Sequence, residues 1–238
     1  MKMIEDDTEN NFDDAPAPTS ENPYLPLFID FSNKIVMIFG GGAVGERKAL
    51  RFMNRAQTVV VSKQFTPRLE EEAKAGNIRL IHMNIFNASD LDLGQLVKGV
   101  FLVIPAMNNA EQNKRIVHYA HIYGSLINET GGSGEVIIPS LIERNGLQIA
   151  ISSGGESPAV TKYARLQIEK AIGADFEKMI EIQNEIREYL KSVVSEQKER
   201  QEILWTIMDS NEIWDLLKSD DETDFEKAKE KAFLMAGK

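Results

Sequence analysis

Short runs of mainly apolar residues alternate with helix-like segments through the first half of the chain. The apolar runs cover 35–39, 58–62, 78–82, 100–104 and 125–128, and the helix-like segments cover 43–55, 66–75 and 109–123. The first run, 35–39, has no polar interruption, which is typical of a strand buried on both faces, and strands that alternate with helices are typical of parallel sheets. The pattern therefore predicts an α/β fold with a doubly wound parallel sheet.

A different pattern begins in the second half. Two strand-like runs, 135–144 and 147–153, flank Asn145-Gly146, a dipeptide that favours a tight hairpin turn. Because an isolated hairpin is only marginally stable in water, we expect it to pack against another surface, and a second copy of the chain is the natural candidate. We assign residues 131–157 to a dimerisation hairpin region.

Amphipathic helices follow the hairpin. Ser157 and Pro158 are typical of a helix N-cap and first helical residue, and Gly173 is typical of a helix end. The apolar spacing predicts helices over 158–172, 175–195 and 199–217, whose hydrophobic stripes we interpret as core. The chain then divides into a disordered acidic tail at 1–22, an α/β domain at 23–130, the hairpin region, a C-terminal helical domain at 158–218 and a charged tail at 219–238.

A glycine-rich turn follows the first apolar run. Gly40, Gly42 and Gly45 fit the spacing G-x-G-x-x-G, and a helix begins near Ala43. In a dinucleotide-binding turn, the glycines permit a tight bend, a close approach of the backbone to pyrophosphate, and close packing of helix on strand. Free N–H groups at the helix start, including that of Val44, attract phosphate. The turn predicts a Rossmann-type domain that binds a dinucleotide cofactor.

Composition excludes several classes of protein and site. The chain of 238 residues has a formal net charge of −10 and lacks cysteine, which rules out disulfides and thiolate ligands. We find no basic stripe and no apolar run near the ~20 residues that span a bilayer, so we expect a cytoplasmic protein without nucleic-acid or membrane partners. Of the three histidines, His118 and His121 share a helix face while His82 lies elsewhere. A third nearby ligand is lacking, so we predict no bound metal.

Three ordered stretches carry a resemblance to one family. They are Gly40–Lys48, Val136–Arg144 and Ser152–Pro158, the last followed by Arg165 and Glu169. Together they resemble the dehydrogenase module of sirohaem synthases, the precorrin-2 dehydrogenase and sirohydrochlorin ferrochelatase family. The resemblance implies NAD⁺-dependent oxidation of precorrin-2 to sirohydrochlorin, Fe²⁺ insertion in many members, and an intertwined homodimer built through the hairpin.

By position, the resemblance also implies which residues contact the cofactor. These are Ala43 and Val44 at the helix start, Lys63 and Gln64 after the second strand, and Ala106 and Met107 after the fourth. The second strand of a dinucleotide-binding fold usually ends in an acid that binds the ribose hydroxyls, whereas this one ends in Ser62-Lys63. Lysine tolerates a 2′-phosphate, so NADP stays open, although the resemblance favours NAD.

A tetrapyrrole substrate carries carboxylates that backbone N–H groups and cations can bind. The turn at Ser153, Gly154 and Gly155 precedes a helix whose first two turns contain Lys162 and Arg165. We predict that these residues bind the substrate. The alternative interpretation is a helix cap at the dimer interface.

The chain departs from the family pattern where an aspartate is assigned a role in oxidation and often in metal insertion. The segment Asn128–Glu135 contains no aspartate. Because a carboxylate beside the macrocycle can accept the proton lost on oxidation, we select Glu129 as the catalytic residue and keep Glu135 as the alternative. The departure leaves Fe²⁺ insertion open. It also leaves two other hypotheses, a catalytically silent nucleotide- or tetrapyrrole-binding relative that acts as a carrier or sensor, and a different small-molecule NAD(P) oxidoreductase.

Overall fold

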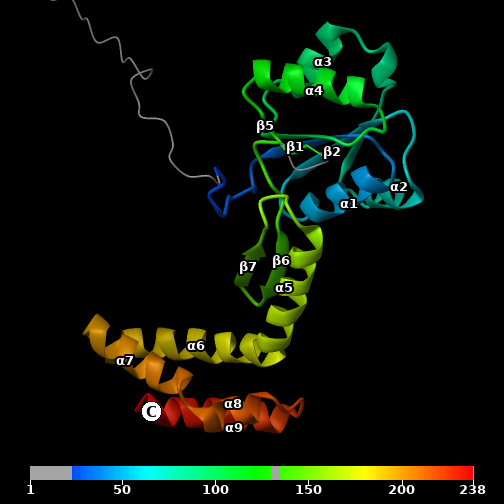
Figure 1. Ribbon diagram of the computed structural model, residues 1–238. Coiled ribbons are helices and arrows are strands. Elements are labelled where there is room, and N and C mark those ends of the chain that lie inside the picture. The colour runs from blue at the N-terminus through cyan, green and yellow to red at the C-terminus, as the bar shows by residue number, and fades with distance from the viewer. Residues whose placement is uncertain (1–22, 130–133, 238) are drawn as a thin grey trace, which may run out of the picture.

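The computed structural model describes residues 23–129 and 134–237. An α/β domain, a hairpin with one long helix, and a group of packed helices follow one another from top to bottom in Figure 1. The acidic tail predicted at 1–22 lies outside the described residues. Among the helices that the structure describes, none is long and apolar enough to cross a membrane.

The α/β domain is built on a five-stranded parallel sheet with the strand order β3-β2-β1-β4-β5. Its strands are β1 (Ile35–Phe39), β2 (Gln57–Ser62), β3 (Arg79–His82), β4 (Leu102–Pro105) and β5 (Leu126–Ile127). The chain moves outward from β1 to β3 and then crosses to β4 on the other side of β1. The carboxyl ends of β1 and β4 therefore flank a switch point, which is where such sheets bind ligands. The predicted doubly wound parallel sheet is confirmed.

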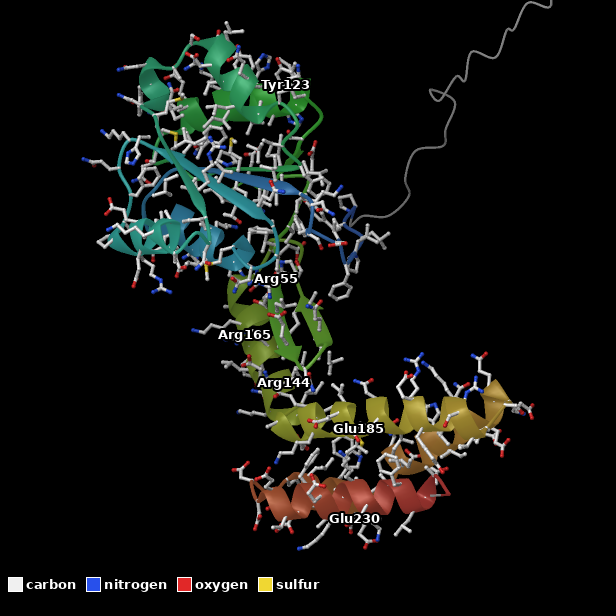
Figure 2. All side chains as sticks on the ribbon, turned by 180° about the vertical axis from the view of Figure 1, so that it is seen from behind. Arg55, Tyr123, Arg144, Arg165, Glu185 and Glu230 are labelled. Atoms are coloured by element: carbon white, nitrogen blue, oxygen red, sulfur yellow. The ribbon has the colours of Figure 1, made fainter. Side chains whose placement is uncertain are left out.

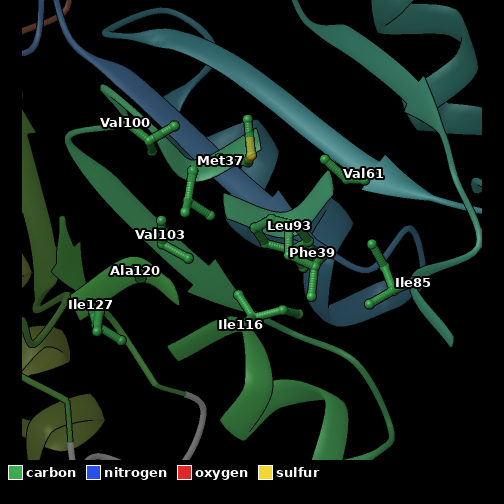
Figure 3. Packing of buried hydrophobic residues seen from close by; sticks show 11 residues of the cluster. Met37, Phe39, Val61, Ile85, Leu93, Val100, Val103, Ile116, Ala120 and Ile127 are labelled. Carbon is green, nitrogen blue, oxygen red and sulfur yellow. The ribbon is translucent and has the colours of Figure 1, made fainter. Parts of the chain in front are cut away.

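Helices cover both faces of this sheet (Figure 1). One face carries α1 (Ala43–Phe52) and α2 (Pro67–Lys74), and the other carries α3 (Asp90–Val97) and α4 (Ala110–Ile122). In Figure 3, Met37, Phe39 and Val103 from the sheet pack with Leu93 from α3 and Ile116 from α4. Burial on both faces explains why the central strands β1 and β4 lack polar alternation.

Two short helices in this domain were not predicted. The 3-10 helix η2 (Ile85–Asn87) precedes α3, which begins with a capping box. The Ser89 hydroxyl accepts the Asp92 N–H, and the Asp92 carboxylate accepts the Ser89 N–H. The Ser-x-x-Asp spacing was visible in the sequence, but such short segments show no clear helical period.

The hairpin pairs β6 (Ser140–Arg144) with β7 (Leu147–Ile151) in antiparallel register, which confirms the predicted turn. Asn145 and Gly146 adopt positive φ angles of 41° and 94°. The first strand was predicted to begin at residue 135, and this was wrong. Val136 and Ile138 pack instead against the sheet core on the α1 face, which satisfies their apolar side chains without strand pairing.

Helices complete the chain. They are α5 (Pro158–Ala171), α6 (Ala174–Val193), α7 (Gln197–Met208), α8 (Asn211–Leu217) and α9 (Glu222–Met235). The single helix predicted over 199–217 is two helices, because the Ser210 hydroxyl accepts the Ile213 N–H and starts a new one. The segment predicted as a charged tail contains α9, whose Ala228 and Ala232 are buried in the core of this group.

Candidate cofactor and active site

A cavity of about 560 Å³ opens at the carboxyl ends of the sheet strands. Its walls come from the glycine turn and from the segments after β2, β3 and β4, namely Gly40–Val44, Val61–Thr66, Met83–Phe86 and Ala106–Asn108. Open parallel sheets bind their ligands in this position, outside the strand ends at the switch point. The fold therefore places the cavity where a dinucleotide would lie.

Close packing in the glycine turn leaves no room for side chains on its inner side. Gly40 has a φ of 125°, and a Cβ there would lie 2.6 Å from the Ala106 carbonyl oxygen. A Cβ on Gly45 would lie 1.8 Å from the Gly40 carbonyl oxygen, because α1 packs directly against the turn. A Cβ on Gly42 would meet nothing within 4 Å, and this residue lines the cavity. Gly40 and Gly45 are thus closely packed, whereas Gly42 faces the open cavity.

Helix α1 begins at the wall of the cavity. Gly42 is its N-cap residue and supplies no side-chain cap, and Ala43 and Val44 line the cavity. The first N–H groups of a helix have no partner within the helix, and its dipole adds partial positive charge at this end. The glycine cradle and the helix start together fit the pyrophosphate of a dinucleotide.

The segment after β2 forms the side of the cavity where a Rossmann domain holds the adenosine ribose. Lys63 and Gln64 line it, and Lys63 is the charged residue among the described lining residues. The Phe65 ring packs edge-on against His82, with ring centroids 4.8 Å apart. The wall therefore offers a cation where an acid is usual.

The segment after β4 is held in place by one side chain of α4. Asn113 Oδ1 accepts the Met107 N–H at 3.2 Å, and Asn113 Nδ2 donates to the Met107 carbonyl at 2.9 Å. Ala106 and Met107 both line the cavity, as expected from their positions after the strand. The paired bonds fix the backbone of this wall.

The structure thus brings the predicted cofactor residues together, with one exception. Gly40, Gly42, Ala43, Val44, Lys63, Gln64, Ala106 and Met107 line one cavity, whereas Gly45 lies beneath the turn. The sequence interpretation missed the wall formed by Met83–Phe86. These residues follow a correctly predicted strand, so the rule that ligands bind beyond strand ends could have identified them.

The two candidate carboxylates have different surroundings. Glu135 Oε2 accepts the Ile127 N–H at 3.2 Å, and its Oε1 lies 3.5 Å from His121 Nδ1. This carboxylate occupies the free edge of β5, where a further strand would otherwise pair. Within the described part of the chain, the Glu129 carboxylate forms no hydrogen bond or ion pair, and neither glutamate lines the cofactor cavity.

A second cavity, of about 220 Å³, lies between the hairpin and the start of α5. Ser153 and Gly155 are among its lining residues, whereas Lys162 and Arg165 are not. The Ser153 hydroxyl accepts the Ser157 N–H at 3.0 Å and so supports the cap of α5. Arg165 pairs with Glu169 at 2.5 Å, and Lys162 is exposed. The predicted substrate residues lie just before α5 and within its first eight residues, and they do not converge on a single cavity.

No cluster of three or more His, Cys, Asp or Glu side chains that could hold a metal occurs among residues 23–129 and 134–237. His121 instead faces Glu135. His82 packs on Phe65.

Comparisons with known proteins agree with this architecture. A family model described as NAD(P)-binding matches residues 27–140, and one described as the central part of sirohaem biosynthesis proteins matches residues 144–171. Precorrin-2 dehydrogenase of Methanosarcina barkeri is 44% identical over 91% of this chain and 95% of its own length. Siroheme synthase 3 of Aeromonas hydrophila is 32% identical over 74% of this chain, which spans 37% of that longer protein.

A solved structure titled "SirC, precorrin-2 dehydrogenase" has the same fold. It matches with a TM-score of 0.69 at 21% identity, over 89% of this chain and 100% of that one. The likeness extends from the parallel sheet through the hairpin to the C-terminal helices. The relative that is 44% identical over 91% of this chain shows the family as well. The chain belongs to the precorrin-2 dehydrogenase family.

Proposed function

We propose that this protein is an NAD⁺-dependent precorrin-2 dehydrogenase that oxidises precorrin-2 to sirohydrochlorin in sirohaem biosynthesis. The observation that carries the proposal is the 44% identity, over nearly the full length of both chains, to a protein named precorrin-2 dehydrogenase. The glycine turn and its cavity of about 560 Å³ support the cofactor half of the proposal. NAD⁺ in this cavity would accept the hydride that the oxidation removes.

The residues of the turn would bind and orient the cofactor. The N–H groups at the start of α1 would hold its pyrophosphate, and the Asn113 clamp would fix Met107 beside the nicotinamide end. Lys63 would lie near the ribose. We favour NAD over NADP because of the family resemblance, and parallel titrations with NADH and NADPH would decide between them.

Oxidation also releases a proton, and we assign its acceptance to a carboxylate oxygen of Glu129. Glu135 is the weaker candidate because its carboxylate already accepts the Ile127 N–H at the edge of β5. The start of α5, with Ser153, Gly154, Gly155, Lys162 and Arg165, would hold substrate carboxylates.

We further propose a homodimer. Helix α5 has no buried residue within one chain, and Val160, Tyr163 and Leu166 project from it with 61%, 66% and 41% of their surfaces exposed. Large apolar side chains at this spacing form one face of the helix, and covering them would release the free energy of hydrophobic burial. A second copy that packs on this face and on the hairpin would do so.

The purified protein tests the proposal directly. Precorrin-2 with NAD⁺ should give sirohydrochlorin and NADH in equal amounts, followed by their absorbance. Tight binding of precorrin-2 without any product would support the silent carrier or sensor instead. NADH formation with other small substrates but not with precorrin-2 would favour a different oxidoreductase. A parallel reaction with sirohydrochlorin and Fe²⁺, as substrates, would reveal any metal insertion.

A further inference from the structure

Lys48 extends from α1 toward the end of β5. Its ammonium donates to Asn128 Oδ1 at 2.8 Å, and no carboxylate of a described residue forms an ion pair with it. Burial lowers the pKa of Lys48, and the nearby charges of Arg47 and Arg51 lower it further. Because a partly buried cation beside other cations costs free energy, stability alone does not account for a lysine here.

Asn128, the partner of Lys48, is itself held from several sides. It is 5% exposed, its Nδ2 donates to the Val136 carbonyl at 2.7 Å, and its N–H donates to the Val103 carbonyl at 3.1 Å. The Val136 N–H in turn donates to the Ile127 carbonyl at 3.0 Å. The side chain of Asn128 thus joins α1 to the chain that returns beside β5, and its backbone N–H adds the link to β4.

The returning chain also lies against the backbone of Glu129. A Cβ on Gly134 would be 2.7 Å from both the Glu129 nitrogen and the Ile127 carbonyl oxygen. The Tyr24 hydroxyl donates to the Gly134 carbonyl at 3.0 Å. We call residues 127–129 and 134–136 the β5 stem. These contacts pack the backbone of the stem closely, and the Lys48 ammonium is the charged group that is hydrogen-bonded to it.

We propose that Lys48 is a positioning residue that orients Glu129 by fixing the Asn128 side chain. The inference rests on the proposed function, in which Glu129 accepts a proton. Asn128 and Glu129 are adjacent in the chain, so a shift of the first moves the Cα of the second. Lys48 does not line the cofactor cavity, so its loss should affect the rate rather than the affinity for NAD.

Three variants test the inference. Lys48→Met keeps much of the side-chain length and removes the donor, Lys48→Arg keeps the charge, and Lys74→Met is the control on the exposed end of α2. Lys48→Met should lower kcat by about 10- to 100-fold with an unchanged KM for NAD⁺, since a misplacement of ~1 Å can cost that much. Amide hydrogen exchange should become faster at residues 126–129 and 136. Lys48→Arg should restore part of both properties, and Lys74→Met should match the parent.

The outcomes separate this inference from the proposed function. If the parent does not oxidise precorrin-2, the proposed function fails, and the exchange data alone then decide whether Lys48 anchors the stem. Unchanged kcat and unchanged exchange in Lys48→Met would overturn the inference. A raised KM for NAD⁺ with normal kcat would also overturn it, because Lys48 would then act on the cofactor. If Lys48→Met fails to fold, Lys48→Arg carries the test. Faster exchange at residues 126–129 than in the parent would support the inference, and equal exchange would overturn it.

Discussion

The guanidinium of Arg55, just beyond α1, and the carboxylate of Glu143 on β6 meet where the α/β domain joins the hairpin. Arg55 Nη2 lies 2.8 Å and 2.7 Å from the two carboxylate oxygens (Figure 2 labels Arg55 at this junction). Nearby, the Arg51 side chain donates to the Pro139 carbonyl at 2.6 Å. These arginines therefore link the α/β domain to the hairpin.

This pair predicts a pH-dependent contribution to stability. The hydrogen bond from Arg55 is the largest cause that lowers the pKa of Glu143. A carboxyl group with a lowered folded-state pKa stabilises the fold above its unfolded pKa of ~4.3 and loses that contribution as the pH falls through the folded-state value. Glu143→Gln should therefore lower the melting temperature slightly at pH 7 and by less at about pH 3.

Both side chains are about half exposed, so the difference at pH 7 should correspond to less than about 1 kcal/mol. Thermal unfolding of parent and variant, followed by circular dichroism, measures it. Arg55→Gln is the matched control. It removes the other member of the pair, so it should abolish the same pH-dependent contribution to the melting temperature. An equal effect of Glu143→Gln at both pH values would contradict the assignment.

The glycine turn predicts two different outcomes from one kind of substitution. Gly45→Ala should destabilise the protein by about 1 kcal/mol or more and weaken NADH binding, because its Cβ would overlap the Gly40 carbonyl. Gly42→Ala has space for its Cβ and a permitted φ of −86°, so it should melt like the parent while its methyl group obstructs the cofactor. Melting curves and NADH titrations measure the two effects. Normal NADH binding by both variants would show that the pyrophosphate does not bind at this turn.

The two glutamates predict opposite phenotypes. Glu129→Ala should lower kcat by about 100-fold or more with unchanged affinity for NADH, because it removes the proposed proton acceptor. Glu135→Ala should keep most of the rate but lose about 1 kcal/mol of stability, because the Ile127 N–H loses its acceptor. Steady-state kinetics and urea unfolding distinguish them. The reverse pattern would transfer the catalytic role to Glu135.

Charge reversal on α5 tests the proposed contact with substrate carboxylates. Lys162→Glu and Arg165→Glu should each raise the KM for precorrin-2 by about 10-fold, since each replaces an attraction by a repulsion, and NADH affinity should stay unchanged. Lys170→Glu, in the last turn of the same helix, is the control. If the control raises KM as much as the others, general charge rather than a binding site would explain the effect.

The exposed face of α5 predicts that Tyr163→Glu breaks a dimer. The parent should elute at twice its chain mass in size-exclusion chromatography with light scattering, and the variant at the mass of one chain, because burying a charge in an apolar interface costs free energy. Leu234→Glu, at a residue 71% exposed on α9, should remain like the parent. A monomeric parent would refute the dimer.

Much of the architecture followed from local signals. Short apolar runs, the glycine turn and Asn145-Gly146 each determine their structure over a few residues, and the predicted parallel sheet and hairpin turn are confirmed. Helix α9 was missed because its inward stripe consists of small residues such as Ala228 and Ala232, which give a weak hydrophobic period. Its many charges concealed the pattern further.

The candidate site was predictable only where it lies next to a strand end in the sequence. The residues after β2 and β4 could be named in advance, since strand ends converge in a parallel sheet. The partners of Lys48 and Glu135 could not be named from the sequence. Each meets a group that is distant along the chain or lies on another element, and no local pattern encodes such a meeting.

The core of helices α6–α9 shares no residue with the two cores of the α/β domain, and α5, which lies between them, has no buried residue of its own. Cooperativity in unfolding depends on shared packing, so each end should respond to damage by itself. Substitutions in helices α6–α9 should then have little effect on the chemistry of the α/β domain.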